Sequence, residues 1–153
     1  MHHNPDPDAI ATGWAILALI RRRLHTPVRL LGRGPILRAE NRQLVSLLQP
    51  PIELVDEIAL DARTATVLVD CAPASFNHLL GGHKAPTAVI DHHESKKDGF
   101  RIPFRDVRPK ATASASISTE YSREQHMEPA APVCPQHEQH QAGSTDQLQP
   151  KLA

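Results

Sequence analysis

Three short clusters of acidic and histidine residues carry side chains that can do chemistry. The first is His2-His3-Asn4-Pro5-Asp6-Pro7-Asp8, the second is Asp70, and the third is Asp91-His92-His93. Carboxylates with some imidazole suit manganese or magnesium better than zinc, and the imidazoles favour manganese. Two such ions, about 3.5–4 Å apart, clamp a phosphate ester and activate water against it. The clusters together predict a two-metal site that acts on a phosphate ester.

Each cluster taken alone has a simpler structural interpretation. Asp8 suits a helix N-cap, and Asp6 suits the positive end of the same helix dipole. Asp70 suits a turn, because Ala72-Pro73 follows it, or a phosphoacceptor site. Asp91-His92-His93 suits a polar turn with solvated histidines. The metal site is favoured because all three clusters are expected at strand ends along one edge of one sheet.

Apolar runs precede the second and third clusters. Residues 66–71 (TVLVDC) and 87–90 (TAVI) are nearly continuous apolar segments, which is typical of parallel strands covered on both faces. Because strands alternate with helical patterns, the expected fold is α/β, with a parallel sheet flanked by helices on both faces. The first strand is expected to be missing, since the chain begins with Met1-His2 where that strand should just have ended. Helices are expected over residues 9–24, 38–48, 75–80 and 111–121, and a further strand over 28–31.

Composition limits the kind of protein. The hydrophobic fraction is 40 % and the aromatic fraction 3 %, which predicts an aliphatic core. The net charge of zero gives no long-range attraction for nucleic acid or an anionic membrane, so an anionic substrate must be held locally. Cys71 and Cys134 are too few for a disulfide framework, and no apolar run has membrane-spanning length. A cytoplasmic location is therefore expected.

Residues 1–121 are expected to fold, and 122–153, rich in Pro, Gln and His, to form a disordered tail.

The joint motif set resembles that of the DHH phosphoesterases. The matching residues are His2-x-x-Pro5-Asp6-Pro7-Asp8-Ala9, then Val69-Asp70, then Asp91-His92-His93, and the similarity covers residues 2–121. It is closest to the branch of RecJ-like exonucleases and NrnA-like nano-RNA hydrolases. The resemblance implies manganese-dependent hydrolysis of phosphodiester or phosphomonoester bonds in short oligonucleotides or small nucleotides, by a two-metal mechanism.

The resemblance also implies a role for each residue. His2 and Asp6 would bind one manganese ion, Asp8 and His92 would bind the second, and Asp70 would bridge the two. Asp91 would orient the neighbouring histidines. His93 would contact the substrate phosphate or help position a ligand.

A helix with small residues is expected to begin near residue 111, after several basic residues. Because helix N-termini bind anions, a substrate phosphate is expected there. The residues predicted to hold it, together with His93, are Arg108, Thr112 and Ser114.

The sequence departs from the family pattern after Tyr121. The family has a further aspartate ligand there, and Asp146 falls near the expected distance, but no apolar segment precedes it. We therefore expect the match at Asp146 to be coincidental. The family's C-terminal substrate-binding domain has no counterpart in this sequence. These departures support an alternative, a truncated and catalytically inactive fragment that at most binds metal or nucleotide.

Overall fold

Strands and helices alternate along the chain. The computed structural model describes residue 1 and residues 3–81, 84–94 and 99–127. The elements are α1 (Pro7–Leu24), β1 (Leu30–Gly32), α2 (Ala39–Leu48), β2 (Ile52–Leu54), β3 (Val67–Val69), β4 (Ala88–Asp91), β5 (Phe104–Val107) and α3 (Ser114–Glu124).

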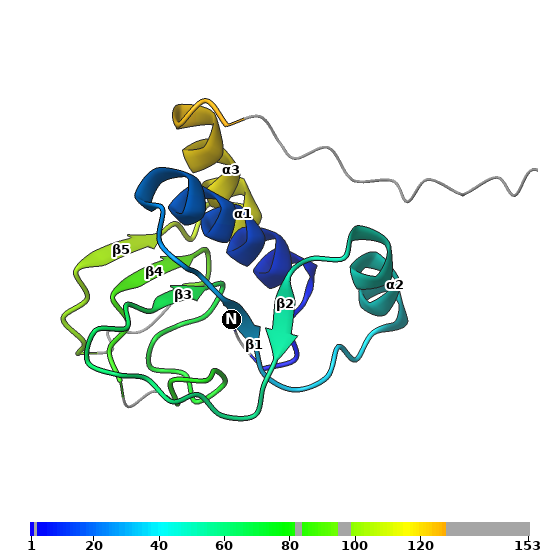
Figure 1. The fold of residues 1–153 in the computed structure, drawn as a ribbon, viewed down its shortest axis with the longest axis horizontal. Coiled ribbons are helices and arrows are strands. Elements are labelled where there is room, and N and C mark those ends of the chain that lie inside the picture. Colours follow the sequence, from blue (N-terminus) through cyan, green and yellow to red (C-terminus); the bar gives the residue numbers. More distant parts are fainter. Residues whose placement is uncertain (2, 82–83, 95–98, 128–153) are drawn as a thin grey trace, which may run out of the picture.

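The strands form two small parallel sheets (Figure 1). β1 pairs with β2, and the other sheet has the order β3-β4-β5. In the second sheet Val69 lies opposite Ile90, so β3 and β4 end side by side. The expected α/β fold, a parallel sheet flanked by helices, is confirmed. Its consequence for function is that residues following β3 and β4 meet at one edge.

The segment that leads into α1 lies between the two sheets. Met1 is buried, and a Cβ at Gly13 would lie 2.5 Å from Leu30 Cδ1, 3.5 Å from Met1 Sδ and 3.6 Å from Val69 Cγ2. These contacts place Met1 beside residues of both β1 and β3. His3 pairs with Arg33 in a single parallel bridge. Where the sequence predicts that a first strand is missing, the described residues before α1 contribute this isolated bridge.

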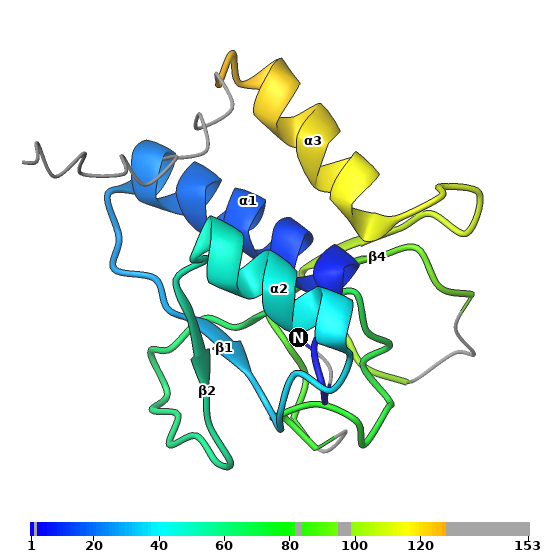
Figure 2. The same cartoon turned by 90° about the vertical axis from the view of Figure 1, so that its right-hand side faces the viewer.

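Helices α1 and α3 pack against each other over the strands (Figure 1). Ile10 and Ile16 of α1 and Ile117 of α3 are buried with Val69 of β3 and Ile90 of β4. The core is aliphatic, as the composition predicts. Ile10 and Trp14 of α1 line one pocket with Leu44 and Leu48 of α2, and Figure 2 shows α2 in front of α1. No helix in the described part of the chain combines the length and the apolar character needed to cross a bilayer.

Several boundaries differ from the predictions. The helix expected over 75–80 is wrong, because this segment forms turns in which the buried His78 ring bonds to the backbone. β2 and β5 were not predicted, since both are short and β5 carries charged residues. The last helix runs from Ser114 to Glu124, three residues beyond the expected end of the folded part. Most of the predicted tail, residues 128–153, lies outside the described residues.

Candidate metal centre

The second and third clusters stand at the ends of adjacent strands. Asp70 directly follows β3, and Asp91 is the last residue of β4. The Asp70 amide donates to the Ile90 carbonyl over 2.9 Å, which ties the two strand ends together. Asp70 has a φ of 54°, a left-handed conformation that aspartate tolerates better than most residues. The chain therefore turns sharply at the residue whose carboxylate lies at the centre of the site.

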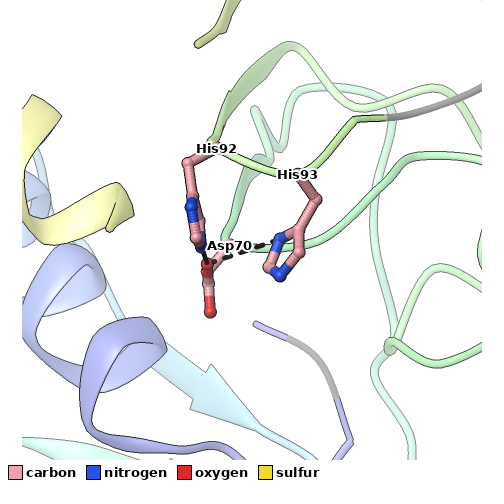
Figure 3. A group of neighbouring side chains, drawn as sticks. All are labelled: Asp70, His92 and His93. Atoms are coloured by element: carbon pink, nitrogen blue, oxygen red, sulfur yellow. Dashed lines mark ion pairs between the residues drawn. The ribbon is translucent and has the colours of Figure 1, made fainter. Parts of the chain in front are cut away.

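Two imidazoles converge on the Asp70 carboxylate (Figure 3). Both His92 Nε2 and His93 Nδ1 lie 3.7 Å from Asp70 Oδ1. One ligand atom from each of the three residues falls within 4.8 Å of the others. The Asp70 side chain is 2 % exposed, whereas His92 is 23 % and His93 is 56 % exposed. The group therefore has a buried carboxylate and a side open to solvent at His93.

Asp91, which the family resemblance implies would orient the histidines, contacts both of them. Its Oδ1 accepts from the backbone amides of His92 and His93 over 2.8 and 3.1 Å, and from the His93 ring Nδ1 over 2.8 Å. The His92 Nδ1 lies 3.3 Å from the Ala111 carbonyl, so Nε2 faces Asp70 and Asp8. A fixed tautomer and ring direction are what neighbouring groups supply at protein metal sites.

The carboxylates at this edge of the sheet repel one another. Burial raises the pKa of Asp70 above its usual value, and the negative charges of Asp8 and Asp6 raise it further, against the hydrogen bond from Ser114. The hydrogen bond to Asp91 raises the pKa of His93. A divalent cation removes repulsion among carboxylates and is bound by the deprotonated ligands. One carboxylate with two imidazoles therefore fits such an ion, with coordination positions left for solvent or substrate.

Asp8 reaches the same site from α1. Its Oδ2 lies 3.5 Å from His92 Nε2, so the predicted partners of one ion are neighbours. The same carboxylate accepts from the backbone amides of Ser114 over 2.9 Å and Ala115 over 2.7 Å, at the start of α3. The N-terminus of α3 therefore already holds an anion, the Asp8 carboxylate, at the place where the sequence predicted a substrate phosphate.

The remaining predicted ligands are placed differently. Asp6 is the N-cap of α1, and its Oδ1 accepts from the Ala9 amide over 3.0 Å. The capping interpretation of the first cluster is thus correct, but for Asp6 and not for Asp8, which stands in the first turn. Asp6 is close enough to affect Asp70 electrostatically, although it is not in the three-residue group. His2 and Asp146 lie outside the described residues.

The predicted substrate ligands around α3 have protein partners. Arg108 forms hydrogen bonds of 2.9 and 2.8 Å with the Asp106 carboxylate and also pairs with Glu120. Ser114 is fully buried, and its hydroxyl donates to Asp70 Oδ1 over 2.9 Å. Thr112 is exposed just before the helix. As substrate ligands, all three stay predictions, and for Arg108 and Ser114 a phosphate would compete with these contacts.

The sequence matches no known protein-family model. It is similar to an uncharacterized protein from Methanocaldococcus jannaschii, with 31 % identity over 131 residues. The similar region covers 84 % of this chain but 26 % of that relative, so the chain spans about a quarter of the relative's length. Fold and site together define an α/β protein with a candidate metal centre at the carboxyl edge of a parallel sheet.

Proposed function

We propose that this protein is a manganese-dependent phosphoesterase of the DHH type. The observation that carries the proposal is the convergence of Asp70, His92 and His93 at the ends of adjacent parallel strands. Supporting it, the spacing of the three clusters resembles that family, and Asp8 from the first cluster lies beside His92. The proposed substrates are short oligonucleotides or small nucleotides, hydrolysed at a phosphodiester or phosphomonoester bond.

Asp70, His92 and His93 would hold one ion, with Asp8 next to it. When bound, the ion supplies Lewis-acid polarisation of a phosphoryl oxygen and lowers the pKa of bound water. The chain's own residues position these ligands: Asp91 accepts from the His92 backbone amide and from the His93 ring, and the start of α3 binds Asp8. His93 is the most exposed of the three and is therefore the side chain best placed to meet a phosphate at the open side.

A second ion belongs to the proposal through the first cluster. Asp6 and His2 are its proposed ligands, with Asp70 as the bridge between the ions. The support is proximity, since Asp6 lies near enough for its negative charge to raise the pKa of Asp70. We also propose a reducing, cytoplasmic location, which suits the buried free thiol of Cys71.

Turnover is the direct test of this function. The purified chain is incubated with manganese and either bis-p-nitrophenyl phosphate or a short RNA. We expect hydrolysis that disappears in Asp70→Ala and His92→Gln but persists in His25→Gln, a substitution at an exposed position beyond α1. Hydrolysis that survives Asp70→Ala, or is equal without metal, would contradict the assignment.

A binding fragment without catalysis is the second candidate. The three residues that cluster within the described part are enough for one ion, and the chain spans 26 % of its relative. This candidate predicts that manganese raises the thermal midpoint of unfolding of the wild type, but not of Asp70→Ala, while neither substrate is hydrolysed. Hydrolysis by the wild type excludes it.

A further inference from the structure

The first turn of α3 contacts two carboxylates of the candidate centre, those of Asp70 and Asp8. The Ser114 hydroxyl donates to Asp70 Oδ1 over 2.9 Å. The backbone amides of Ser114 and Ala115 donate to the two oxygens of Asp8 over 2.9 and 2.7 Å. Ser114 is fully buried and therefore lies behind the carboxylates, away from solvent.

The tie to Asp8 replaces an ordinary helix cap. The N-cap residue of α3 is Ala113, which has no side-chain acceptor for the free amides of the first turn. Asp8, from the first turn of α1, provides that acceptor across 106 positions of sequence. The carboxylate that caps α3 is thus the same one that lies beside His92.

The tie to Asp70 fixes a carboxylate that the backbone leaves at a sharp turn. A carboxylate has about four acceptor sites, so a hydrogen bond from Ser114 orients it and is compatible with a bound cation. Partners of this kind are worth about 10–100-fold in metal affinity at characterised sites. Ser114 is the buried side chain whose hydroxyl contacts Asp70 from α3.

We propose that Ser114 is a positioning residue, which together with the first turn of α3 sets Asp70 and Asp8 for a bound cation. It acts through Asp70 and does not touch substrate. The inference rests on the proposed function in one respect, that the site binds manganese. It replaces the expected role of Ser114 as a substrate ligand with one in metal affinity.

Ser118 provides a matched control on the same helix. It is 1 % exposed, and its hydroxyl donates to the Ala115 carbonyl over 3.0 Å, so it bonds within α3. Ser118→Ala and Ser114→Ala each remove one buried hydroxyl from α3. The substitution at Ser114 alone removes a bond to the centre.

The experiment is a calorimetric titration of manganese into the metal-free full chain, paired with urea unfolding. We expect Ser114→Ala to raise the Kd about tenfold or more, and Ser118→Ala to leave the Kd unchanged even where it lowers stability. Ser114→Thr keeps the hydroxyl and is expected to restore much of the affinity. If Ser114→Ala does not fold, Ser114→Cys replaces it, since a thiol fills the space but is a weak donor.

The outcomes separate the inference from the function beneath it. A wild type that binds manganese, with Ser114→Ala or Ser114→Cys binding equally well, overturns the inference and leaves the proposed function standing. Equal losses at Ser114 and Ser118 also overturn it, because the effect is then general to α3. A wild type that binds no manganese overturns the proposed function and the inference together.

Discussion

Arg108 and Asp106 face each other in a bidentate pair, with Nε 2.9 Å from Oδ1 and Nη2 2.8 Å from Oδ2. Arg108 also pairs with Glu120 of α3, and the Tyr121 hydroxyl donates to Asp106. These contacts of the Arg108 guanidinium and the Asp106 carboxylate connect the end of β5 to α3. Because α3 in turn contacts Asp8 and Asp70, the Asp106–Arg108 pair stabilises the helix that supports the candidate centre.

Asp106→Asn tests the contribution of the Asp106–Arg108 pair through the pH dependence of the free energy of unfolding. The hydrogen bond and charge of Arg108 lower the pKa of Asp106 in the folded state. The stabilisation that this pair gives the folded state is therefore complete above the unfolded pKa of about 3.9, and it is lost as the pH falls through the lower pKa of the folded state. We expect Asp106→Asn to be less stable near neutral pH and to lack this component of acid unfolding. Urea unfolding from about pH 6 downward measures it, and parallel curves for the two proteins would contradict the role.

His78→Asn tests a second titrating group, one that is not among the three residues of the candidate metal group. Its ring is buried, with Nδ1 accepting from the Leu80 amide and Nε2 donating to the Pro73 carbonyl, each over 3.2 Å. Burial lowers the pKa of His78, so the unfolded chain binds the proton more readily. Stability contributed by the neutral ring is therefore complete above the unfolded pKa of about 6.5 and declines as pH falls below it.

We expect the free energy of unfolding of the wild type to fall as the pH decreases over that range. For His78→Asn we expect a free energy of unfolding that is lower at neutral pH by about 1–3 kcal/mol and that changes less with pH. His25→Asn is the control, since His25 is exposed and in a left-handed conformation that asparagine tolerates. A His78→Asn curve as steep as that of the wild type would exclude His78 as the titrating group.

Asp91→Ala tests how the histidines are oriented. Asp91 is fully buried, and one of its oxygens accepts from both histidine amides and from the His93 ring. We expect its removal to weaken manganese binding by about 10–100-fold, the usual effect of losing a group that orients metal ligands. Affinity measured by titration, on protein shown to be folded by circular dichroism, is the readout. Unchanged affinity would mean that the histidines need no such support.

The sequence predicted the strand-end residues because their cause is local. An apolar run ending in an acid marks the carboxyl end of a buried parallel strand, and this placed Asp70 and Asp91 correctly. The contacts of Ser114 with Asp70 and of Asp8 with α3 span 44 and 106 positions, and no periodicity encodes such distances. The resemblance implied that His93 contacts the substrate phosphate or helps to position a ligand, and the fold places it in one group with Asp70 and His92, whose ligand atoms lie within 4.8 Å of one another.

The errors in secondary structure have physical causes too. The segment 75–80 is short and lies between Pro73 and Gly81, and burial of His78 fixes it as turns where a weak helical propensity has no effect. β5 carries Arg105 and Asp106, so its apolar signal is weak. The segment forms a strand because it pairs with β4, although its composition does not favour one.

Manganese binding by wild type and Asp70→Asn tests the central claim most directly. The substitution removes the charge but keeps a side chain of the same shape that tolerates the left-handed backbone. Asp56→Asn, at an exposed position, is the matched control. Electron paramagnetic resonance of free manganese gives the bound fraction. We expect the wild type and Asp56→Asn to bind the ion with equal affinity and Asp70→Asn to lose binding, whereas equal binding by all three, or by none, would contradict a metal centre at Asp70.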